Sequence, residues 1–311
     1  MKIAFVFPGQ GSQYVGMAKE FIETFEESRN VFTTASELLG FDIAQLCMHG
    51  PAEKLNLTEN TQPAILTASL AILRPLEKNG IAADAVAGHS LGEYTAVTAA
   101  GGLDLKDAVT LVHKRGRYMQ EAVPEGTGLM AAIIGMERED VEKTCLEAAK
   151  NGIVAPANYN APGQIVIAGE KKAVEAAIDL ANAGGAKMVV PLKVSVPSHS
   201  PMMKEAGLKL ARELEEVTIN DLRIPIVNNA DAKFLKKASD LRPSLTKQIS
   251  SPLYWEDAIR NMADEGFDTF VEIGPGKVLT GLVKRILKDA KVLNVEDRKS
   301  LENALSSLGV T

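Results

Sequence analysis

A serine lies between two glycines in the segment Gly88-His89-Ser90-Leu91-Gly92, which has the form Gly-x-Ser-x-Gly. Glycines at these positions allow a turn from strand to helix so sharp that the serine hydroxyl stands clear of neighbouring side chains. Small apolar residues lead into the motif from Ala85, and a helix-compatible run follows over residues 91–100. A helix starting there would direct main-chain N–H groups at an oxyanion on an attacked carbonyl. We therefore expect Ser90 to be a nucleophile that attacks a carbonyl carbon.

One of the four histidines suits the role of a general base better than the others. His89 lies on the strained turn and should point away from the serine, His113 lies within a predicted helix, and His49 precedes a Gly-Pro turn. His199 lies in the proline-bounded loop 195–203, which a rigid scaffold can position. No acidic residue stands out as its orienting partner, so a backbone or amide carbonyl is the alternative. We expect His199 to be the general base.

The predicted helix 103–123 carries the basic cluster Lys114-Arg115-Gly116-Arg117. Such clusters are most often solvated faces of helices. If this helix packs beside the helix that follows Ser90, the guanidinium of Arg115 can clamp a substrate carboxylate through two parallel hydrogen bonds.

A glycine-rich turn at residues 8–13 follows the predicted strand 2–7. A dinucleotide-binding fingerprint starting at Gly9 needs a glycine at position 14, where Tyr14 stands. The turn is therefore either a plain connection or a loop whose N–H groups line an anion or oxyanion site.

The composition excludes several classes of protein. The 311 residues are 46% hydrophobic and 24% charged, which suffices for one large domain or two unequal ones. The net charge of −6 disfavours general nucleic-acid binding. Cys47 and Cys145 lie far apart without metal-ligand spacing, and no stretch approaches the apolar length that spans a bilayer. We expect no metal, no nucleic-acid partner, no membrane residence and a cytoplasmic location.

Strands and helices alternate around the candidate residues. A strand at residues 2–7, helices over 16–39 and 61–78, a strand leading into Ser90 and the helix after it predict a parallel sheet. Further strands are expected at 224–228 and 269–273, with helices at 254–265, 278–289 and 298–308. We expect an α/β fold, with an α/β-hydrolase-like large domain whose site lies beyond the carboxyl ends of the strands.

Residues 128–192 have a different pattern. Strands at 128–135, 153–158, 164–168 and 186–192 and helices at 137–150 and 171–183 give the order β-α-β-β-α-β. This order is typical of a ferredoxin-like domain. We therefore expect a small domain at 126–192, inserted into a large domain formed by 1–125 and 193–311, with a cleft between them. The asparagines of the segment 158–163 are expected to be turn formers.

With these residues in hand, the chain resembles the bacterial malonyl-CoA:acyl carrier protein transacylase family from Ile3 to about Ile286. Several motifs in the right order are more specific than Gly-x-Ser-x-Gly alone. The segments are Phe7-Pro8-Gly9-Gln10-Gly11-Ser12-Gln13, Thr61-Gln62-Pro63-Ala64, Gly88-His89-Ser90-Leu91-Gly92-Glu93-Tyr94, Arg115-Gly116, Asn160-Ala161-Pro162-Gly163-Gln164, Pro197-Ser198-His199 and Glu272-Ile273-Gly274-Pro275-Gly276.

The resemblance implies roles for individual residues. It implies a Ser90–His199 dyad whose imidazole is oriented by a main-chain carbonyl near Gln248. It also implies an oxyanion hole made by the N–H groups of Gln10 and Leu91. In the same way it implies a carboxylate clamp at Arg115 and an active-site wall position at Asn160.

The activity implied by the resemblance is the transfer of a malonyl group from malonyl-CoA to an acyl carrier protein in type II fatty-acid synthesis. No cofactor is expected, because coenzyme A enters as a thioester substrate and the partner protein carries the phosphopantetheine. An acidic carrier protein can dock on a basic stripe beside the cleft, Lys284, Arg285 and Lys288, for which a solvated face is the alternative. A serine thioesterase or hydrolase, a malonyl-loading enzyme of polyketide synthesis and a non-catalytic carrier-binding subunit remain alternatives.

Overall fold

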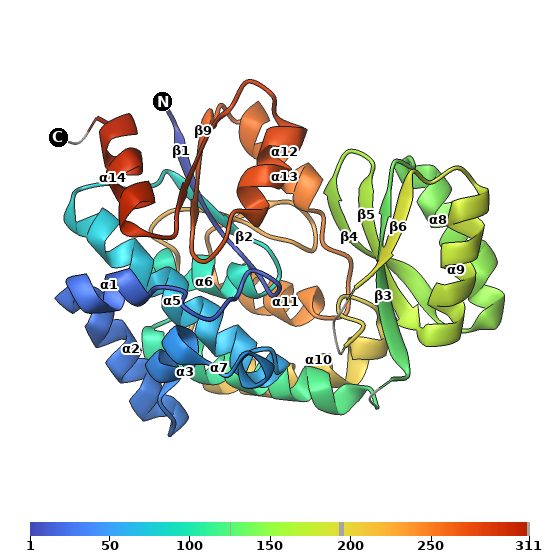
Figure 1. Ribbon diagram of the computed structural model, residues 1–311, viewed down its shortest axis with the longest axis horizontal. Helices are drawn as coiled ribbons and strands as arrows, with labels where there is room; N and C mark the ends of the chain where they lie inside the picture. The colour runs from blue at the N-terminus through green and yellow to red at the C-terminus, as the bar shows by residue number, and fades with distance from the viewer. Residues whose placement is uncertain (125, 193–195, 310–311) are drawn as a thin grey trace.

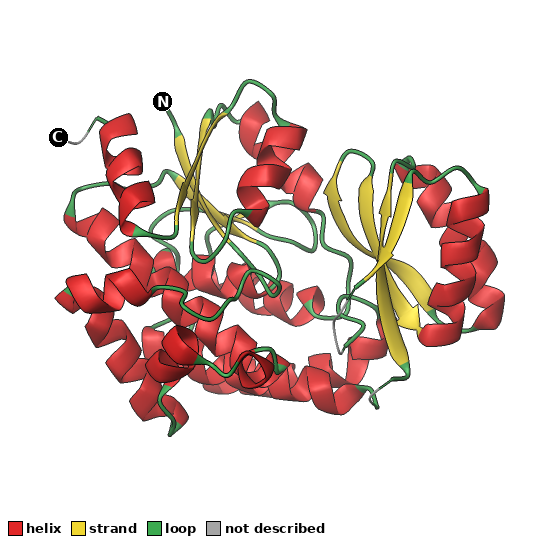
Figure 2. Ribbon diagram, in the orientation of Figure 1, coloured by secondary structure: helices red, strands yellow, loops and turns green. Residues whose placement is uncertain are grey.

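The computed structural model describes residues 1–124, 126–192 and 196–309, which form two β-sheets with helices packed around them (Figure 1, Figure 2). The larger sheet has the strand order β10-β9-β1-β2-β7-β8. Its strands are β1 (Ile3–Phe7), β2 (Ala85–Gly88), β7 (Ile226–Val227), β8 (Phe234–Leu235), β9 (Thr269–Ile273) and β10 (Lys291–Val295). Its neighbouring strands are parallel, except that β8 runs antiparallel to β7. The fold is therefore mixed α/β with a largely parallel sheet.

Helices cover both faces of this sheet (Figure 1). They are α1 (Lys19–Thr24), α2 (Glu26–Leu39), α3 (Ile43–His49), α4 (Ala52–Leu55), α5 (Thr58–Lys78), α6 (Leu91–Ala99), α7 (Leu105–Ala122), α10 (Lys204–Glu216), α11 (Ala238–Gln248), α12 (Trp255–Asp264), α13 (Val278–Ile286) and α14 (Arg298–Ser307), with a short 3₁₀ helix, η2 (Pro201–Met203). Phe5 and Phe7 of β1 pack in the core that contains α2, α5 and α6, whereas Ala4 and Val6 pack with α12 and α13. Because both faces are covered, β1 is a continuous apolar run.

Helix α5 continues through Pro63 and Pro75, although a proline cannot donate a hydrogen bond to the carbonyl four residues earlier. Other helices supply the missing donors. The ring Nδ1 of His113, on α7, bonds to the carbonyl freed by Pro63 at 2.9 Å. The hydroxyl of Ser28, on α2, donates to the carbonyl freed by Pro75 at 2.7 Å. His113 therefore holds α5 against α7.

The smaller sheet is antiparallel, with the strand order β4-β5-β3-β6. Its elements are β3 (Gly128–Ile134), α8 (Arg138–Ala148), the short 3₁₀ helix η1 (Ala149–Asn151), β4 (Val154–Ala161), β5 (Gln164–Glu170), α9 (Lys171–Ala183) and β6 (Met188–Pro191). Helices α8 and α9 cover the outer face, and the other face is turned toward the larger sheet (Figure 1). Met130, Ala157 and Val166 form a small apolar cluster there.

The turn predicted around Asn158 and Asn160 is wrong, because both residues belong to strand β4. The turn is confined to residues 162–163. Tyr159, between the two asparagines, packs in the core beneath α8 and α9. With a side-chain period of two, the asparagines therefore lie on the opposite face, toward the larger sheet. The main-chain N–H of Tyr159 also donates to the carbonyl of Leu253 at 2.9 Å, which ties β4 to the segment after α11.

The boundaries predicted between the two domains fall at or beside residues 125 and 193–195, which lie outside the described residues, as does the start of the predicted loop 195–203. Among the described helices, none combines the length and the apolar character that crossing a bilayer requires.

Candidate active site

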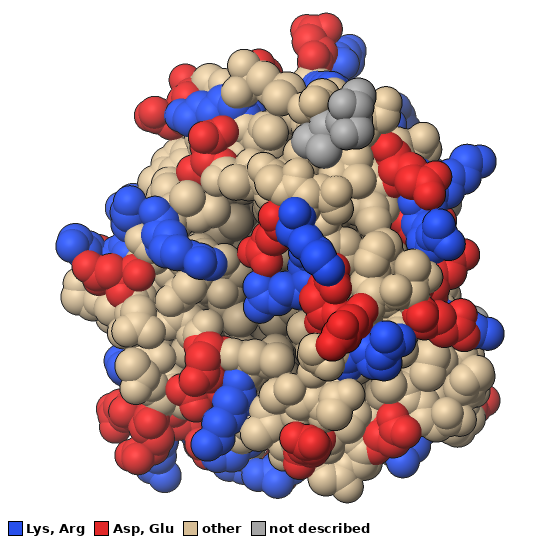
Figure 3. All heavy atoms as spheres, turned by 90° about the vertical axis from the view of Figure 1, so that its left-hand side faces the viewer, with Lys and Arg blue, Asp and Glu red and all other residues tan. Residues whose placement is uncertain are grey.

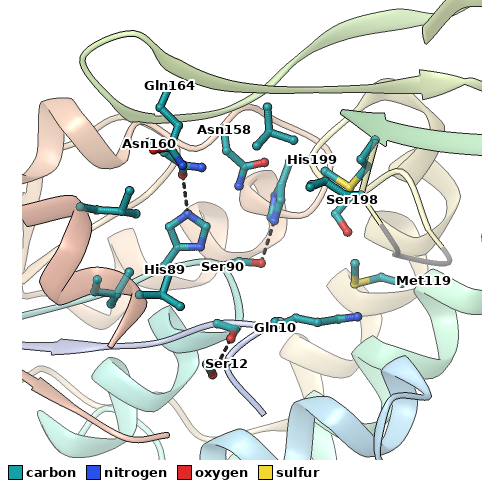
Figure 4. A pocket seen from close by; sticks show the side chains of 18 of the residues that line it. Gln10, Ser12, His89, Ser90, Met119, Asn158, Asn160, Gln164, Ser198 and His199 are labelled. Atoms are coloured by element: carbon teal, nitrogen blue, oxygen red, sulfur yellow. Dashed lines mark hydrogen bonds between the residues drawn. The ribbon is translucent and has the colours of Figure 1, made fainter. Parts of the chain in front are cut away.

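A cavity of about 220 Å³ lies between the carboxyl ends of the large-sheet strands and the open face of the small sheet. Its lining comes from the loop after β1, the turn after β2, helices α7 and α13, strands β3 to β5 and the loop before η2. Ser90 and His199 lie side by side within it, with Gln10 below them in the view of Figure 4. The structure thus brings together residues more than 100 positions apart in the sequence, since the hydrogen bond from Ser90 to His199 spans 109 residues.

Ser90 occupies a strained backbone conformation at the turn between β2 and α6. Its φ is 54° and its ψ is −109°, which a residue with a Cβ adopts at a cost of about 1–3 kcal/mol. The flanking glycines allow the turn, because a Cβ on Gly88 would lie 1.9 Å from the carbonyl oxygen of Gly92. A Cβ on Gly92 would lie 2.0 Å from the carbonyl oxygen of Phe7. The motif therefore folds as the sequence predicts, with no room for a larger residue at either glycine.

The hydroxyl oxygen of Ser90 lies 2.7 Å from Nε2 of His199, and Nδ1 of His199 lies 2.9 Å from the main-chain carbonyl oxygen of Gln248 (Figure 4). A carbonyl oxygen only accepts hydrogen bonds, so Nδ1 carries the proton and donates it. Nε2 is then the free acceptor, ready to take the proton of the serine hydroxyl. A carbonyl thus does here what an aspartate does in a Ser-His-Asp triad.

Burial and the nearby Arg115 cation lower the pKa of His199 from 6.5 to about 3. His199 is 1% exposed, so its charged form would lose nearly all of its hydration. The imidazole of the free protein is therefore neutral over the physiological pH range and available as a base.

A serine-directed fluorophosphonate should label Ser90 at a rate that is constant between about pH 5 and about pH 7.5, because His199 stays unprotonated there. The second-order rate constant of labelling, followed by intact mass, measures this. An acid inflection near 6.5, the ordinary pKa of histidine, would contradict the assignment.

Arg115 is buried, with 1% of its surface exposed, and its guanidinium reaches the nucleophile. Nη1 donates to Oε1 of Gln62 at 2.8 Å, and Nη2 lies 3.0 Å from Oε1 of Gln248 and 3.4 Å from the hydroxyl oxygen of Ser90. Nε is buried without a partner among the described residues. A buried cation with a spare donor beside a nucleophile can hold an anionic part of a substrate.

The two basic neighbours of Arg115 are solvated. Lys114 pairs with Glu213 at 2.6 Å and Arg117 with Glu121 at 3.6 Å, both on the partly exposed surface. The solvated-face interpretation of this cluster is therefore right for Lys114 and Arg117 and wrong for Arg115.

Gln10 and Leu91 belong to two segments that meet beside Ser90. Gln10 is in the loop after β1, and Leu91 is the first residue of α6. β1 and β2 are paired, so the loop and the turn leave the same edge of the sheet. Neither main-chain N–H donates a hydrogen bond to another described residue. Both are thus available to an oxyanion.

His89 points toward Asn160 and not toward the hydroxyl of Ser90, as predicted, although its side chain also lines the cavity (Figure 4). Its Nε2 lies 2.9 Å from Oδ1 of Asn160, and its ring meets the edge of Trp255 at 5.6 Å. Ser90 and His89 thus both line the cavity but have different hydrogen-bond partners, His199 and Asn160. Asn160 therefore lies in the cavity wall, at the place expected for it.

Three buried residues of this network received no role from the sequence, although the first two stand in segments that carry the resemblance: Gln62, Glu93 and Asn229. Burial raises the pKa of Glu93 to about 7, although hydrogen bonds from Gln248 and from the main chain of Asn229 act in the opposite direction. One signal was present for Asn229. It follows the predicted strand 224–228, and the carboxyl ends of parallel strands meet at one edge of a sheet.

Known proteins match nearly the whole chain. A family model described as "Acyl transferase domain" matches residues 4–303. A malonyl CoA-acyl carrier protein transacylase of Escherichia coli (strain K12) is 48% identical over 305 residues, covering 98% of this chain and 99% of the relative. One of Bacillus subtilis (strain 168) is 46% identical and covers 99% and 97%.

Solved structures agree with these relatives. An acyl carrier protein S-malonyltransferase from Vibrio cholerae superposes with a TM-score of 0.96 at 46% identity, covering 98% of this chain and all of the other. A malonyl-transacylase in complex with its type II PKS acyl-carrier protein gives 0.97 at 47% identity, covering 99% and 100%. The chain therefore belongs to the acyl transferase domain family, among the malonyl CoA-acyl carrier protein transacylases.

Proposed function

We propose that this protein transfers the malonyl group of malonyl-CoA to the phosphopantetheine thiol of an acyl carrier protein in type II fatty-acid synthesis. The observation that carries the proposal is the contact of one hydroxyl oxygen, that of Ser90, with both the His199 base and the buried Arg115 cation. A nucleophile beside a buried cation suits an acyl group that ends in a carboxylate.

In the first step, Nε2 of His199 takes the proton of Ser90 while the serine oxygen attacks the thioester carbonyl. The N–H groups of Gln10 and Leu91 hold the oxyanion of the tetrahedral intermediate. The bond from carbon to sulfur then breaks, His199 gives its proton to the leaving sulfur, and coenzyme A departs. Malonyl-Ser90 remains.

In the second step, the carrier thiol gives its proton to His199 and attacks the malonyl ester. The same oxyanion contacts hold the second intermediate, and Ser90 recovers its proton as it leaves. The chain and its two substrates supply every group in this sequence, so we propose that no cofactor takes part.

Arg115 holds the free carboxylate of the malonyl group during both steps. The bound carboxylate also offsets the cation that lowers the pKa of His199, so substrate binding strengthens the base at the moment it is needed. Specificity and proton transfer are thus coupled through one guanidinium.

An acidic carrier protein is proposed to dock beside α13, which lines the cavity with Val278, Leu279 and Leu282. Lys284, Arg285 and Lys288 are exposed on and just after this helix. Arg285 also donates to Oε1 of Gln164 on the small sheet, which places it at the rim between the two sheets. On the face shown in Figure 3, by contrast, basic and acidic side chains are interspersed.

We also propose a ferredoxin-like small domain, an α/β-hydrolase-like large domain and a cytoplasmic location. The strand order β4-β5-β3-β6 with the element order β-α-β-β-α-β supports a ferredoxin-like small domain at 126–192. The strand-turn-helix around Ser90 supports an α/β-hydrolase-like large domain at 1–125 and 193–311. Two buried free thiols, Cys47 and Cys145, support a reducing cytoplasm.

Two-substrate initial rates test the transfer. Because coenzyme A leaves before the carrier thiol attacks, double-reciprocal plots at several fixed carrier concentrations should be parallel lines. Intersecting lines would show that both substrates bind before any chemistry, and would overturn the mechanism.

A further inference from the structure

Asn229 is buried beneath the nucleophile without lining the cavity. It follows β7, which pairs with β2 in parallel, so it lies beside the turn that carries Ser90. Its side-chain Oδ1 accepts the main-chain N–H of Ser90 at 2.8 Å, and its Nδ2 donates to the carbonyl of Gly88 at 2.7 Å. The side-chain amide of Asn229 thus bonds to the main chain of the strained turn both before and after His89.

The two contacts fix the orientation of this amide. An N–H can only meet the oxygen of Asn229 and a carbonyl can only meet its nitrogen, so a flipped amide would lose both hydrogen bonds. The same two hydrogen bonds also hold the two peptide groups on either side of His89. Because Ser90 has a φ of 54°, which L-residues rarely adopt, its conformation depends on such contacts.

The backbone of Asn229 is itself anchored. Its N–H donates to Oε2 of the buried Glu93 at 3.2 Å, and its carbonyl accepts the N–H of Tyr254 at 2.9 Å. Gln248 donates from Nε2 to the same Glu93 oxygen and to the carbonyl of Ser90, both at 2.8 Å. The carboxylate of Glu93 therefore joins the residue that holds Ser90 to the residue whose carbonyl orients His199.

We propose that Asn229 is a positioning residue of acyl transfer, whose side-chain amide holds the turn at Ser90 so that the hydroxyl meets His199 and the Leu91 N–H stays free for the oxyanion. The proposal rests on the proposed function and extends it to a residue that touches no substrate. Since the Ser90 N–H is taken by Asn229, the next N–H along the chain, that of Leu91, is the one left for the reaction.

The adjacent Asn228 provides a matched control. It is equally buried in the same loop, but its side chain bonds to Ser244, Asp231 and the N–H of Lys233, not to the turn. Asn228→Ala removes three side-chain hydrogen bonds without releasing Ser90, and Asn229→Ala also removes three when the 3.5 Å bond from Nε2 of Gln248 to Oδ1 of Asn229 is counted.

We expect Asn229→Ala to slow malonylation of Ser90 by about 100-fold with little change in the malonyl-CoA concentration for half-saturation, because small misplacements of reacting groups cost this much. Asn228→Ala should acylate within about threefold of the parent protein when folded to the same extent. Circular dichroism at the assay temperature checks folding. A rate for Asn229→Ala within threefold of the parent, or equal losses in the two folded variants, would overturn the proposal.

Asn229→Asp gives a second test, because a purely structural role of Asn229 would not produce the pH dependence expected for this variant. A carboxylate accepts the Ser90 N–H but cannot donate to the Gly88 carbonyl, whereas a protonated carboxyl does both. Gln248 of α11 lies next to the position of the new carboxyl, 3.5 Å from Oδ1 of Asn229, and Glu93 of α6 accepts the N–H of the same residue. Arg115 of α7 and His199 both bond to Gln248, and Asp231 lies in the same loop as residue 229. The two carboxylates oppose ionisation and the Arg115 cation favours it.

The acylation rate of Asn229→Asp relative to the parent should therefore rise as the pH falls from about 8 to about 5.5, while the ratio for Asn229→Ala stays constant. The alanine variant keeps Glu93, so it controls for titration of that residue. A flat ratio for the aspartate variant would contradict the proposal.

Fluorophosphonate labelling of Ser90 separates this proposal from the proposed function. If the parent protein forms no malonyl adduct, malonyl transfer is wrong, and slower labelling of Asn229→Ala than of Asn228→Ala still supports positioning by Asn229. Equal labelling of the two variants overturns positioning, whatever the natural acyl group is.

Discussion

Alanine in place of His199 should slow the acylation of Ser90 by malonyl-CoA by roughly three to five orders of magnitude. The serine hydroxyl then has no base at hydrogen-bond distance, since Nε2 of His199 at 2.7 Å is the only imidazole nitrogen that contacts it among the described residues. Arg115 is the other described residue whose side chain contacts the hydroxyl, and a guanidinium cannot accept its proton. The time course of the malonyl adduct by rapid-quench intact mass measures the effect.

His113→Ala is the matched control for this prediction. It removes a histidine that bonds to a helix carbonyl outside the site, so it should lower stability while leaving acylation of the folded protein close to that of the parent. Acylation of His199→Ala at a comparable rate would mean that another group is the base, and the dyad would be wrong.

Alanine in place of Arg115 should remove the preference for malonyl over acetyl groups. Losing the partner of a buried carboxylate costs about 2 to 5 kcal/mol, so malonyl transfer should fall while acetyl transfer, which gains nothing from the cation, falls far less. Lysine at the same position should restore part of the preference, because a point charge lacks the two parallel donors. The ratio of kcat/KM for malonyl-CoA to that for acetyl-CoA measures this.

Two further observables accompany the change at Arg115. Removing the cation should raise the pKa of His199, so an acid inflection should enter the labelling profile at higher pH than in the parent protein. Lys114→Ala, one residue earlier and paired with Glu213 at the surface, should leave both the ratio and the profile unchanged. An unchanged malonyl-to-acetyl ratio in Arg115→Ala would refute the clamp.

The sequence predicts those parts of the fold that depend on contacts between residues close together in the chain. Gly88 and Gly92 are required by contacts within one turn, so the turn at Ser90 can be read from five residues. The apolar run of β1 and the order of elements between residues 128 and 192 are equally local signals. Strand β10 was not predicted, because Lys291–Val295 is half-exposed at the edge of the sheet and lacks a clear apolar pattern.

The parts that escaped prediction depend on distant packing. No pattern distinguishes Arg115 from Lys114 and Arg117, and only the packing of α7 against α5 and α6 turns one of the three inward. The partner of His89 could not be predicted either, because Asn160 lies 71 residues away and meets it only across the cavity. The contacts of Asn229 join segments that come together only in the folded sheet.

Intact-protein mass spectrometry after brief mixing with malonyl-CoA tests the central claim most directly, with Ser90→Ala measured in parallel and holo acyl carrier protein added afterwards. The structure predicts one malonyl adduct that is absent from Ser90→Ala and is discharged onto the carrier. An adduct that is released only to water would make the protein a hydrolase. The absence of any adduct, or an adduct on Ser90→Ala, would contradict transfer through Ser90.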